Sequence, residues 1–447
     1  MQKIEPLFDF SSDKSNILIY QSKASICINN NTYSGNGDVR LELSPNAGIY
    51  LYGSFQGVPV VDAFNAHSGQ ENVAAFCING HQIEGFKLSS GGNAGSQEFN
   101  LKWCPTSEPI KVIGTESTKM SYLIFHVFNF VNFIGTRSSV EENGTTSYRI
   151  EHLDLISDEW NIEIKSLYST RDIYKMLSEK GGYRLTHIGC IRKDDRTSFT
   201  GKSATDCLNA LKFFLSFAKG GWCEPVCSVG FNETGRRVWE SWTSPREPWY
   251  VPFSWFDPHN SVQLATMFPS FMNKWQDSDW NEAFHEIIYW YLNANYSSRG
   301  IEPGIILTQA AIERLAFEYA VKTKKLVTVN GFKALWASDK FRLLFSSLEI
   351  PLEVPKYTSE IESLSKKFNW LDAPHALTEI RNSLVHPENK KRGRLDTVYY
   401  EAWNLGLWFL EMGILAICCF SGKYRNRLKK QRWIGQVEDV PWSKNKS

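Results

Sequence analysis

The segment from Arg381 to Pro387 holds the residues whose types and spacing best suit catalysis in this chain. It reads Arg-Asn-Ser-Leu-Val-His-Pro, so His386 follows Arg381 by five residues. A histidine exchanges protons near neutral pH, and an arginine is a permanently charged, planar donor for phosphate oxygens. These groups suit RNA cleavage by the neighbouring 2′-hydroxyl, which requires no metal-activated water. The spacing alone is a weak signal, so the surrounding sequence has to support the prediction.

The sequence around this pair predicts a helix that ends at His386. Pro374 suits the first turn of a helix, and Pro387 disfavours helical geometry in the residue before it. A long apolar helix is predicted to follow, with Asp396 as its N-cap and its end at Phe420. The loop between the two helices is basic, with Lys390, Lys391, Arg392 and Arg394.

This arrangement resembles the HEPN superfamily, whose signature is an arginine, a polar residue, three variable residues and a histidine. Asn382 fills the polar position of that signature. The resemblance covers about residues 279–434. A β-rich region followed by such a domain is also similar in outline to bacterial antiphage HEPN proteins of the ApeA kind.

The resemblance implies a metal-independent endoribonuclease without a cofactor, acting in antiphage defence or growth arrest. Its substrate would be RNA, with tRNA as one candidate, and its products would carry a 2′,3′-cyclic phosphate. Asn382 would orient the histidine or the phosphate, and Glu313 resembles the acidic residue that many members hold near the pair. Members usually form homodimers, so the apolar helix from Trp403 to Phe420 is a candidate for the interface; its alternative role is the core of the helical bundle.

A second basic run follows the apolar helix and contains no acid between Ser421 and Ile434. As a phosphate-tracking strip it would give salt-dependent RNA affinity, and Tyr424 within it would stack on a base. The alternative is a solvated chain segment after a buried helix. The residues assigned to RNA binding in this run are Lys423, Arg425 and Arg427.

The first half of the chain is predicted to be β-rich. Apolar residues alternate with polar ones from Val39 to Leu43 and from Trp160 to Ile164, a period typical of strands with one buried face. We therefore expect a sandwich or barrel-like sheet of unresolved topology in residues 1–200, acting as a recognition or sensor region for a phage-derived or other trigger. Residues 201–278 are expected to hold one helix and an irregular connecting layer rich in tryptophan and proline.

Residues 279–447 are predicted to be helical with a basic tail, which makes the fold class α+β. Periodicity and end signals predict each helix. The expected helices are 172–180, 204–219, 280–295, a helix that begins after Pro303 and ends near 322, 340–348, 359–368, 374–386 and 396–420.

Length, charge and composition limit the classes of protein to which this chain can belong. The chain has 447 residues, which suggests about two or three domains, and its net charge of +1 gives no global attraction to nucleic acid or membrane. Nine scattered cysteines and the absence of a signal-peptide pattern at the start predict a reducing cytoplasm. Asn404 and Glu411 interrupt the apolar run from Trp403 to Phe420, so a buried helix is expected there instead of a membrane span.

Several alternatives remain open from the sequence. Arg381 and His386 could be a salt-bridged arginine and a capping histidine, and Glu313 an ordinary solvated acid. The whole domain could be a catalytically silent HEPN module that binds RNA or dimerises. The chain could also be a ligand-binding protein, in which the β-rich half recognises a sugar, nucleotide or phage protein. No zinc site is predicted at Cys223 and Cys227, because no second pair of ligands lies nearby in the sequence.

Overall fold

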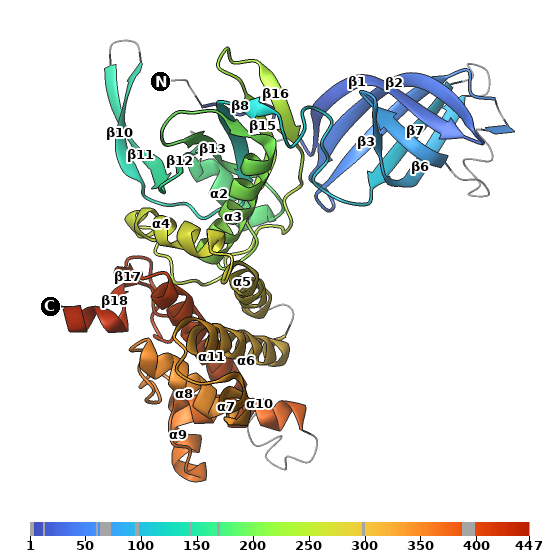
Figure 1. The fold of residues 1–447 in the computed structure, drawn as a ribbon. Helices are drawn as coiled ribbons and strands as arrows, with labels where there is room; N and C mark the ends of the chain where they lie inside the picture. The colour runs from blue at the N-terminus through green and yellow to red at the C-terminus, as the bar shows by residue number, and fades with distance from the viewer. Residues whose placement is uncertain are drawn as a thin grey trace. The chain divides into compact units, whose positions relative to one another are not determined.

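The computed structural model describes residues 4–446 apart from 12–13, 60, 63–72, 94–97, 143–144, 168–169, 297–299 and 387–397. The first half is β-rich and the last part is helical, which confirms the predicted α+β class (Figure 1). The chain forms two compact units, each assembled from separate stretches of sequence. The first comprises Met1–Asn132, Glu159–Asn209 and Cys223–Tyr250; the second comprises Phe133–Asp158, Ala210–Trp222 and Val251–Ser447.

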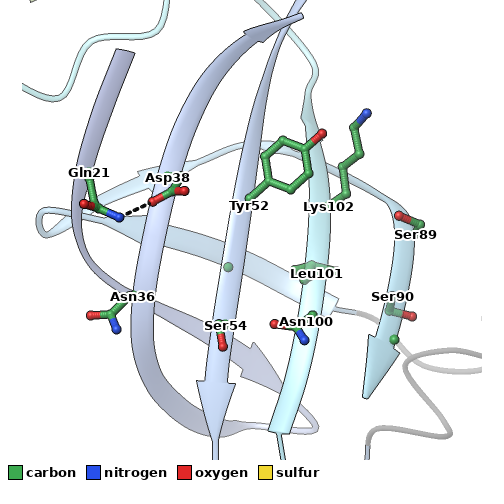
Figure 2. Close-up of a pocket in the computed structure, with 12 residues that line it drawn as sticks. Gln21, Asn36, Asp38, Tyr52, Ser54, Ser89, Ser90, Asn100, Leu101 and Lys102 are labelled. Carbon is green, nitrogen blue, oxygen red and sulfur yellow. Dashed lines mark hydrogen bonds between the residues drawn. The ribbon is translucent and has the colours of Figure 1, made fainter. Parts of the chain in front are cut away.

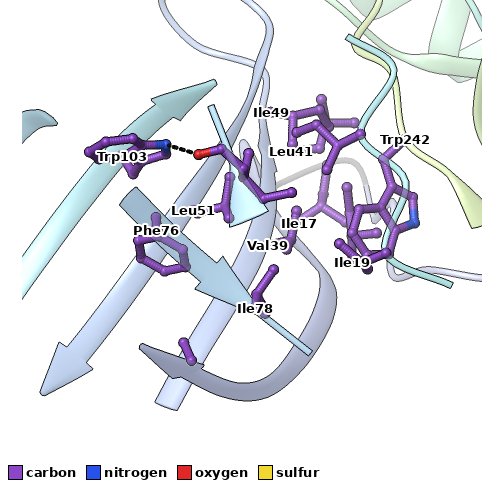
Figure 3. Close-up of a cluster of buried hydrophobic side chains, with 14 of the residues drawn as sticks. Ile17, Ile19, Val39, Leu41, Ile49, Leu51, Phe76, Ile78, Trp103 and Trp242 are labelled. Atoms are coloured by element: carbon purple, nitrogen blue, oxygen red, sulfur yellow. Dashed lines mark hydrogen bonds between the residues drawn. The ribbon is translucent and has the colours of Figure 1, made fainter. Parts of the chain in front are cut away.

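An antiparallel sheet in the order β5-β4-β1-β2-β3-β7-β6 opens the first unit. Its strands are β1 (Asn16–Ile28), β2 (Asn31–Glu42), β3 (Gly48–Gln56), β4 (Val73–Ile78), β5 (His81–Ile83), β6 (Gly85–Asn93) and β7 (Glu98–Pro105). The alternation predicted around Val39 is confirmed, because Val39 and Leu41 are buried while Arg40 is half-buried. Their face forms an apolar core with Leu51, Phe76 and Trp103 (Figure 3). The indole of Trp103 donates a hydrogen bond of 3.2 Å to the carbonyl of Ile83, so its polar atom is satisfied within this core.

The first unit also contains strands paired in the order β12-β13-β9-β15-β16. They are β9 (Tyr122–Phe128), β12 (Trp160–Ser166), β13 (Leu185–Lys193), β15 (Pro225–Phe231) and β16 (Arg237–Ser241), beside the short pair β8 (Lys119–Met120) and β14 (Phe199–Thr200). Two helices complete this part, α2 (Thr170–Lys180) and α3 (Gly201–Lys219), of which α3 ends in the second unit. The irregular layer expected after Trp222 is therefore corrected, since β15 and β16 lie there. Every residue of β15 is buried, so the alternation that marks a half-exposed strand is missing from its sequence.

The second unit combines the hairpin of β10 (Thr136–Glu142) and β11 (Thr145–Ile156) with the C-terminal helices. The helix α4 (Val262–Gln276) packs against β11 and lies inside the segment that was expected to be irregular. The remaining elements are α5 (Asn281–Asn295), α6 (Ile301–Phe317) with a π-helical turn at Glu318–Thr323, α7 (Val329–Ala334), α8 (Ala337–Ser347), α9 (Ser359–Phe368), α10 (Ala373–Val385), α11 (Tyr399–Ile417), β17 (Lys423–Tyr424), β18 (Glu438–Asp439) and a final 3₁₀ turn at Pro441–Lys446.

The helix α11 is the central helix of the helical part, which confirms the prediction of a buried helix. It packs against α5, α6 and α10, and nearly all its side chains are buried. Gly406 brings α11 close to α6, because a Cβ there would lie only 2.6 Å from the hydroxyl of Thr308. These side chains are already covered within one chain, so they leave little apolar surface for the homodimer interface predicted for this helix. Among the described helices, none is both long and apolar enough to span a membrane.

Candidate catalytic and RNA-contact site

The helix α10 carries the candidate catalytic residues, and its start is fixed to α8. Asp372 is the N-cap, and its carboxylate accepts a hydrogen bond of 2.9 Å from the backbone N–H of His375. The same carboxylate accepts two hydrogen bonds from the guanidinium of Arg342, at 2.5 and 3.1 Å. Such a bidentate ion pair sets direction as well as distance, so it fixes where α10 begins.

The inner face of α10 is held against the other helices. Ala376, Leu377, Ile380 and Ser383 are buried. The buried side chain of Gln309 on α6 donates a hydrogen bond of 2.6 Å to the carbonyl of Leu377. Because this amide would be costly to bury without a partner, the bond fixes the position of α10 relative to α6. The opposite face of α10 is left for Arg381 and Asn382, which are both half-buried.

The end of α10 presents the histidine to solvent. His386 is the C-cap, with φ of −107° and ψ of 109°, so the chain becomes extended at this residue as predicted from Pro387. Its backbone N–H donates a hydrogen bond of 3.0 Å to the carbonyl of Asn382, while its side chain is exposed. The guanidinium of Arg381 donates a hydrogen bond of 3.4 Å to the side-chain oxygen of Asn382. The structure thus joins Arg381 to Asn382 and places an accessible imidazole at the end of the same helix.

Glu313 is accounted for by a different contact. It lies on α6, and its half-exposed carboxylate accepts a hydrogen bond of 2.5 Å from the ammonium of Lys340 on α8. An ion pair at such an exposed carboxylate contributes little stability. This contact agrees with the alternative that Glu313 is an ordinary surface acid. A role for Glu313 beside Arg381 and His386 stays a prediction.

Of the two sets of predicted RNA-binding residues, the structure describes only the second. Lys390, Lys391, Arg392 and Arg394 lie outside the described residues, as does the predicted N-cap Asp396. Lys423 is exposed on β17. The guanidinium of Arg425 lies 4.4 Å from the centre of the Phe253 ring and donates a hydrogen bond to the carbonyl of Arg432, which leaves it only partly accessible.

Arg427 is withdrawn from the RNA-contact set because its side chain is only 1% exposed. Its guanidinium donates to both carboxylate oxygens of Glu411, at 2.5 and 2.9 Å, and to the carbonyl of Phe253 at 3.2 Å. The phenol of Tyr291 donates a further hydrogen bond of 2.7 Å to Glu411. We call these three side chains, Arg427, Glu411 and Tyr291, the buried ionic triad.

Tyr424 is also buried, so the base-stacking role expected for it is corrected. Its hydroxyl accepts a hydrogen bond of 3.1 Å from the indole of Trp408 and donates one of 2.7 Å to Glu438. Burial is the largest cause that raises the pKa of Tyr424 above its ordinary value, followed by the negative charge of Glu438. The phenol therefore stays neutral and serves as a polar link inside the second unit.

A hollow of about 460 Å³ in the second unit brings together another set of aromatic and basic groups. Its lining combines two tyrosines, Tyr357 and Tyr400, with Lys429, Lys430 and Arg432, and we call it the tyrosine–lysine hollow. The tyrosines are 46% and 50% exposed. Glu401 also lines it, but its carboxylate accepts hydrogen bonds from the backbone N–H groups of residues 360 and 361 at the start of α9. The acid is thereby engaged in capping α9.

Local sequence patterns contain little signal for this hollow. The lysines belong to the basic run already noted, yet Tyr357 precedes α9 and Tyr400 lies in the first turn of α11, both outside that run. Only the packing of α9 and α11 brings them together. Within the described ranges, no group of three or more histidine, cysteine or acidic side chains could hold a metal ion.

Comparison with known proteins identifies similar chains. Residues 115–253 match the model of the YopA central domain, and residues 277–439 match that of the YopA C-terminal domain. The second match encloses α5 to β18 and thus Arg381, Asn382 and His386. No solved structure gives a significant match. The SPbeta prophage-derived uncharacterized protein YopA of Bacillus subtilis (strain 168) is 28% identical over 441 residues, covering 95% of each chain, so this protein is similar to YopA along almost its whole length.

Proposed function

We propose that this protein is a metal-independent endoribonuclease of the HEPN type, with Arg381 and His386 as its catalytic pair. The observation that carries the proposal is the end of α10, where an exposed imidazole follows a half-buried guanidinium that is hydrogen-bonded to Asn382. The anchoring of α10 by Asp372 and Gln309 supplies the rigidity that a catalytic constellation needs.

The residues suit attack of a ribose 2′-oxygen on the adjacent phosphorus. The 2′-hydroxyl loses its proton to a base, the new P–O bond forms, and the P–O5′ bond breaks while the 5′-oxygen gains a proton. His386 acts as the proton donor or acceptor, because an imidazole is suited to both roles near neutral pH. Arg381 stabilises the charge that gathers on the equatorial phosphoryl oxygens, for which its planar fork of donors is well shaped. The products are a 2′,3′-cyclic phosphate and a free 5′-hydroxyl.

The tyrosine–lysine hollow is proposed to hold part of the RNA strand. Exposed aromatic rings provide platforms on which bases of any sequence stack, and lysines neutralise the backbone phosphates. Lys430 is exposed, whereas Lys429 is engaged at 2.6 Å with Glu438. Lys430 is therefore the lysine best placed to meet a phosphate.

Changing Lys430→Glu is expected to weaken binding of single-stranded RNA and to lower the slope of log affinity against log salt by about 1. Fluorescence anisotropy with a labelled oligonucleotide at several salt concentrations measures both quantities. Lys367→Glu is the matched control, because Lys367 is an exposed lysine of α9 outside the hollow. An equal loss in both variants would mean that only net charge matters, and the hollow would have no specific role.

The proposal is tested by incubating the purified full chain with total cellular RNA in the presence of EDTA. We expect cleavage to continue without divalent metal and every new 3′ end to carry a cyclic phosphate, because the nucleophile belongs to the RNA itself. End-specific sequencing identifies these ends. Cleavage that stops in EDTA, or that leaves 3′-hydroxyls, would rule out this mechanism.

Growth arrest is the physiological effect that we propose, with phage infection as the context. The similarity to a prophage-derived protein supports that context. Induced expression should slow growth in cells carrying the wild-type chain and leave cells carrying His386→Ala unaffected. Equal growth in both would favour the alternative of a catalytically silent module that binds RNA.

A further inference from the structure

The face of the first sheet opposite its apolar core carries two adjacent rows of polar residues. The strand registers place them side by side across neighbouring strands. The first row is Gln21, Asp38, Tyr52, Lys102 and Ser89, on β1, β2, β3, β7 and β6. The second row is Asn36, Ser54, Asn100 and Gly91. Each residue of a row is the direct partner of the next, so the rows form one continuous surface.

These rows line a hollow of about 590 Å³, which lies within the range of small-molecule sites in proteins. Figure 2 shows the side chains of both rows on one face of the sheet, with Asn36 and Asn100 on either side of Ser54. Gly53 also lines the hollow and places no side chain there. We call this surface the amide hollow.

The charged groups of the amide hollow are already neutralised by protein partners. Asp38 is 2.7 Å from the guanidinium of Arg40 and accepts a hydrogen bond of 2.8 Å from Gln21. Lys102 is 2.8 Å from Glu42, and its ammonium lies 4.2 Å from the centre of the Tyr50 ring. A phosphate or a nucleic-acid backbone would need uncompensated positive charge, which these pairs do not supply.

The remaining lining suits a neutral ligand with many hydroxyl groups. The side chains of Gln21, Asn36 and Asn100 are exposed. Each amide has two N–H donors and an oxygen with two lone pairs, so the hydrogen bonds of Gln21 to Asp38 and of Lys23 to Asn36 leave both a donor and an acceptor for neighbouring hydroxyls. The half-buried ring of Tyr52 adds apolar surface in the middle of the sheet, against which C–H groups of a sugar ring can pack, and the cations of Arg40 and Lys102 lie 5.4 and 5.5 Å from its centre. The phenol of Tyr52 donates to Glu42, so this ring is held in place.

We propose that the amide hollow binds a neutral saccharide, so that the chain has a carbohydrate-recognition surface in its first unit. This inference is independent of the ribonuclease proposal, because it uses residues of another unit and predicts binding without cleavage. Successive side chains of each strand point to opposite faces of the sheet. This surface is therefore separate from the core, and its polar groups are not required for packing.

The test uses the fluorescently labelled full chain on an array of neutral and sialylated glycans, with poly(U) RNA as a competitor. We expect neutral glycans to retain the wild-type chain, and the double variant Asn36→Ala/Asn100→Ala to bind at least tenfold more weakly. Asn100→Trp, which fills the hollow from an exposed strand position, should also abolish binding. Gln82→Ala is the matched control, because it removes an exposed amide from β5 outside the hollow.

Thermal melting of each variant separates lost binding from lost folding. Retention by no glycan, or equal affinity in the double variant and the Gln82 control, would overturn the proposal. Displacement by poly(U) would assign the surface to nucleic acid and would equally overturn it. Retention by sialylated glycans alone would contradict the charge argument.

Discussion

Replacing His386 by alanine is expected to lower the rate of RNA cleavage by a factor of about 10²–10⁴, the range for loss of general acid–base catalysis. Because the side chain is exposed at the end of α10, its removal leaves no cavity and should not disturb folding. Single-turnover cleavage of a defined RNA measures the chemical step without product release. His81→Ala is the matched control, since it removes an exposed histidine from β5 in the first unit.

Arg381 should show a different dependence on side-chain type. Its removal by Arg381→Ala is expected to lower the rate by a factor of about 10²–10³, as for loss of one preorganised donor at a developing negative charge. Arg381→Lys keeps the charge but loses the fork, so it should restore activity only in part. The double variant of Arg381 and His386 should be little worse than His386→Ala, because residues that act as a unit are not additive. Unchanged cleavage in both single variants would refute the proposed catalytic pair.

Breaking the buried ionic triad is the change with the largest expected effect on stability. Glu411→Ala should lower the free energy of unfolding by about 3–5 kcal/mol, because it leaves the charge of Arg427 buried without its partner. Both side chains are at most 1% exposed, so water cannot replace the lost contacts. Tyr291 would also lose its acceptor. Urea unfolding followed by fluorescence measures the change.

The matched variant removes both charges together. Glu411→Met with Arg427→Met should recover most of the lost stability, because replacing a buried ion pair by apolar side chains of similar volume is often neutral or better. A single Glu411→Ala variant within about 1 kcal/mol of the wild type would show that the pair is worth no more than a surface salt bridge.

The predictable parts of the fold are those where local pattern and tertiary environment agree. The helix predicted at Ser359–Phe368 has these bounds in the structure, and β12 shows the buried and half-buried alternation expected from Trp160 onwards. The missed elements lack such a pattern. β15 is buried along its whole length, and α4 contains Pro269 within the helix, where proline normally argues against helical structure.

The candidate site was predictable only where it depends on contiguous sequence. The end of α10 follows from Pro374 and Pro387, so the setting of His386 could be inferred. The burial of Arg427 could not be inferred, because it lies in a basic run and its partner Glu411 is in turn bound by Tyr291, which is distant in the chain. The tyrosine–lysine hollow likewise depends on helix packing that no local pattern encodes.

The division of the chain into alternating stretches has a consequence for its synthesis. The chain passes between the two units five times along the sequence, so no single cut separates them. A fragment that starts near residue 276 would lack β10, β11, α4 and the last part of α3. Phe284 would then lose its ring contact with Phe271, at 5.0 Å, and the pair of Phe214 and Phe268 would be missing altogether. A growing chain on the ribosome faces the same constraint, because the hairpin of β10 and β11 is synthesised well before α4, the helix that packs against β11. The helix α10 packs against α11, so it can be positioned only when translation is nearly complete.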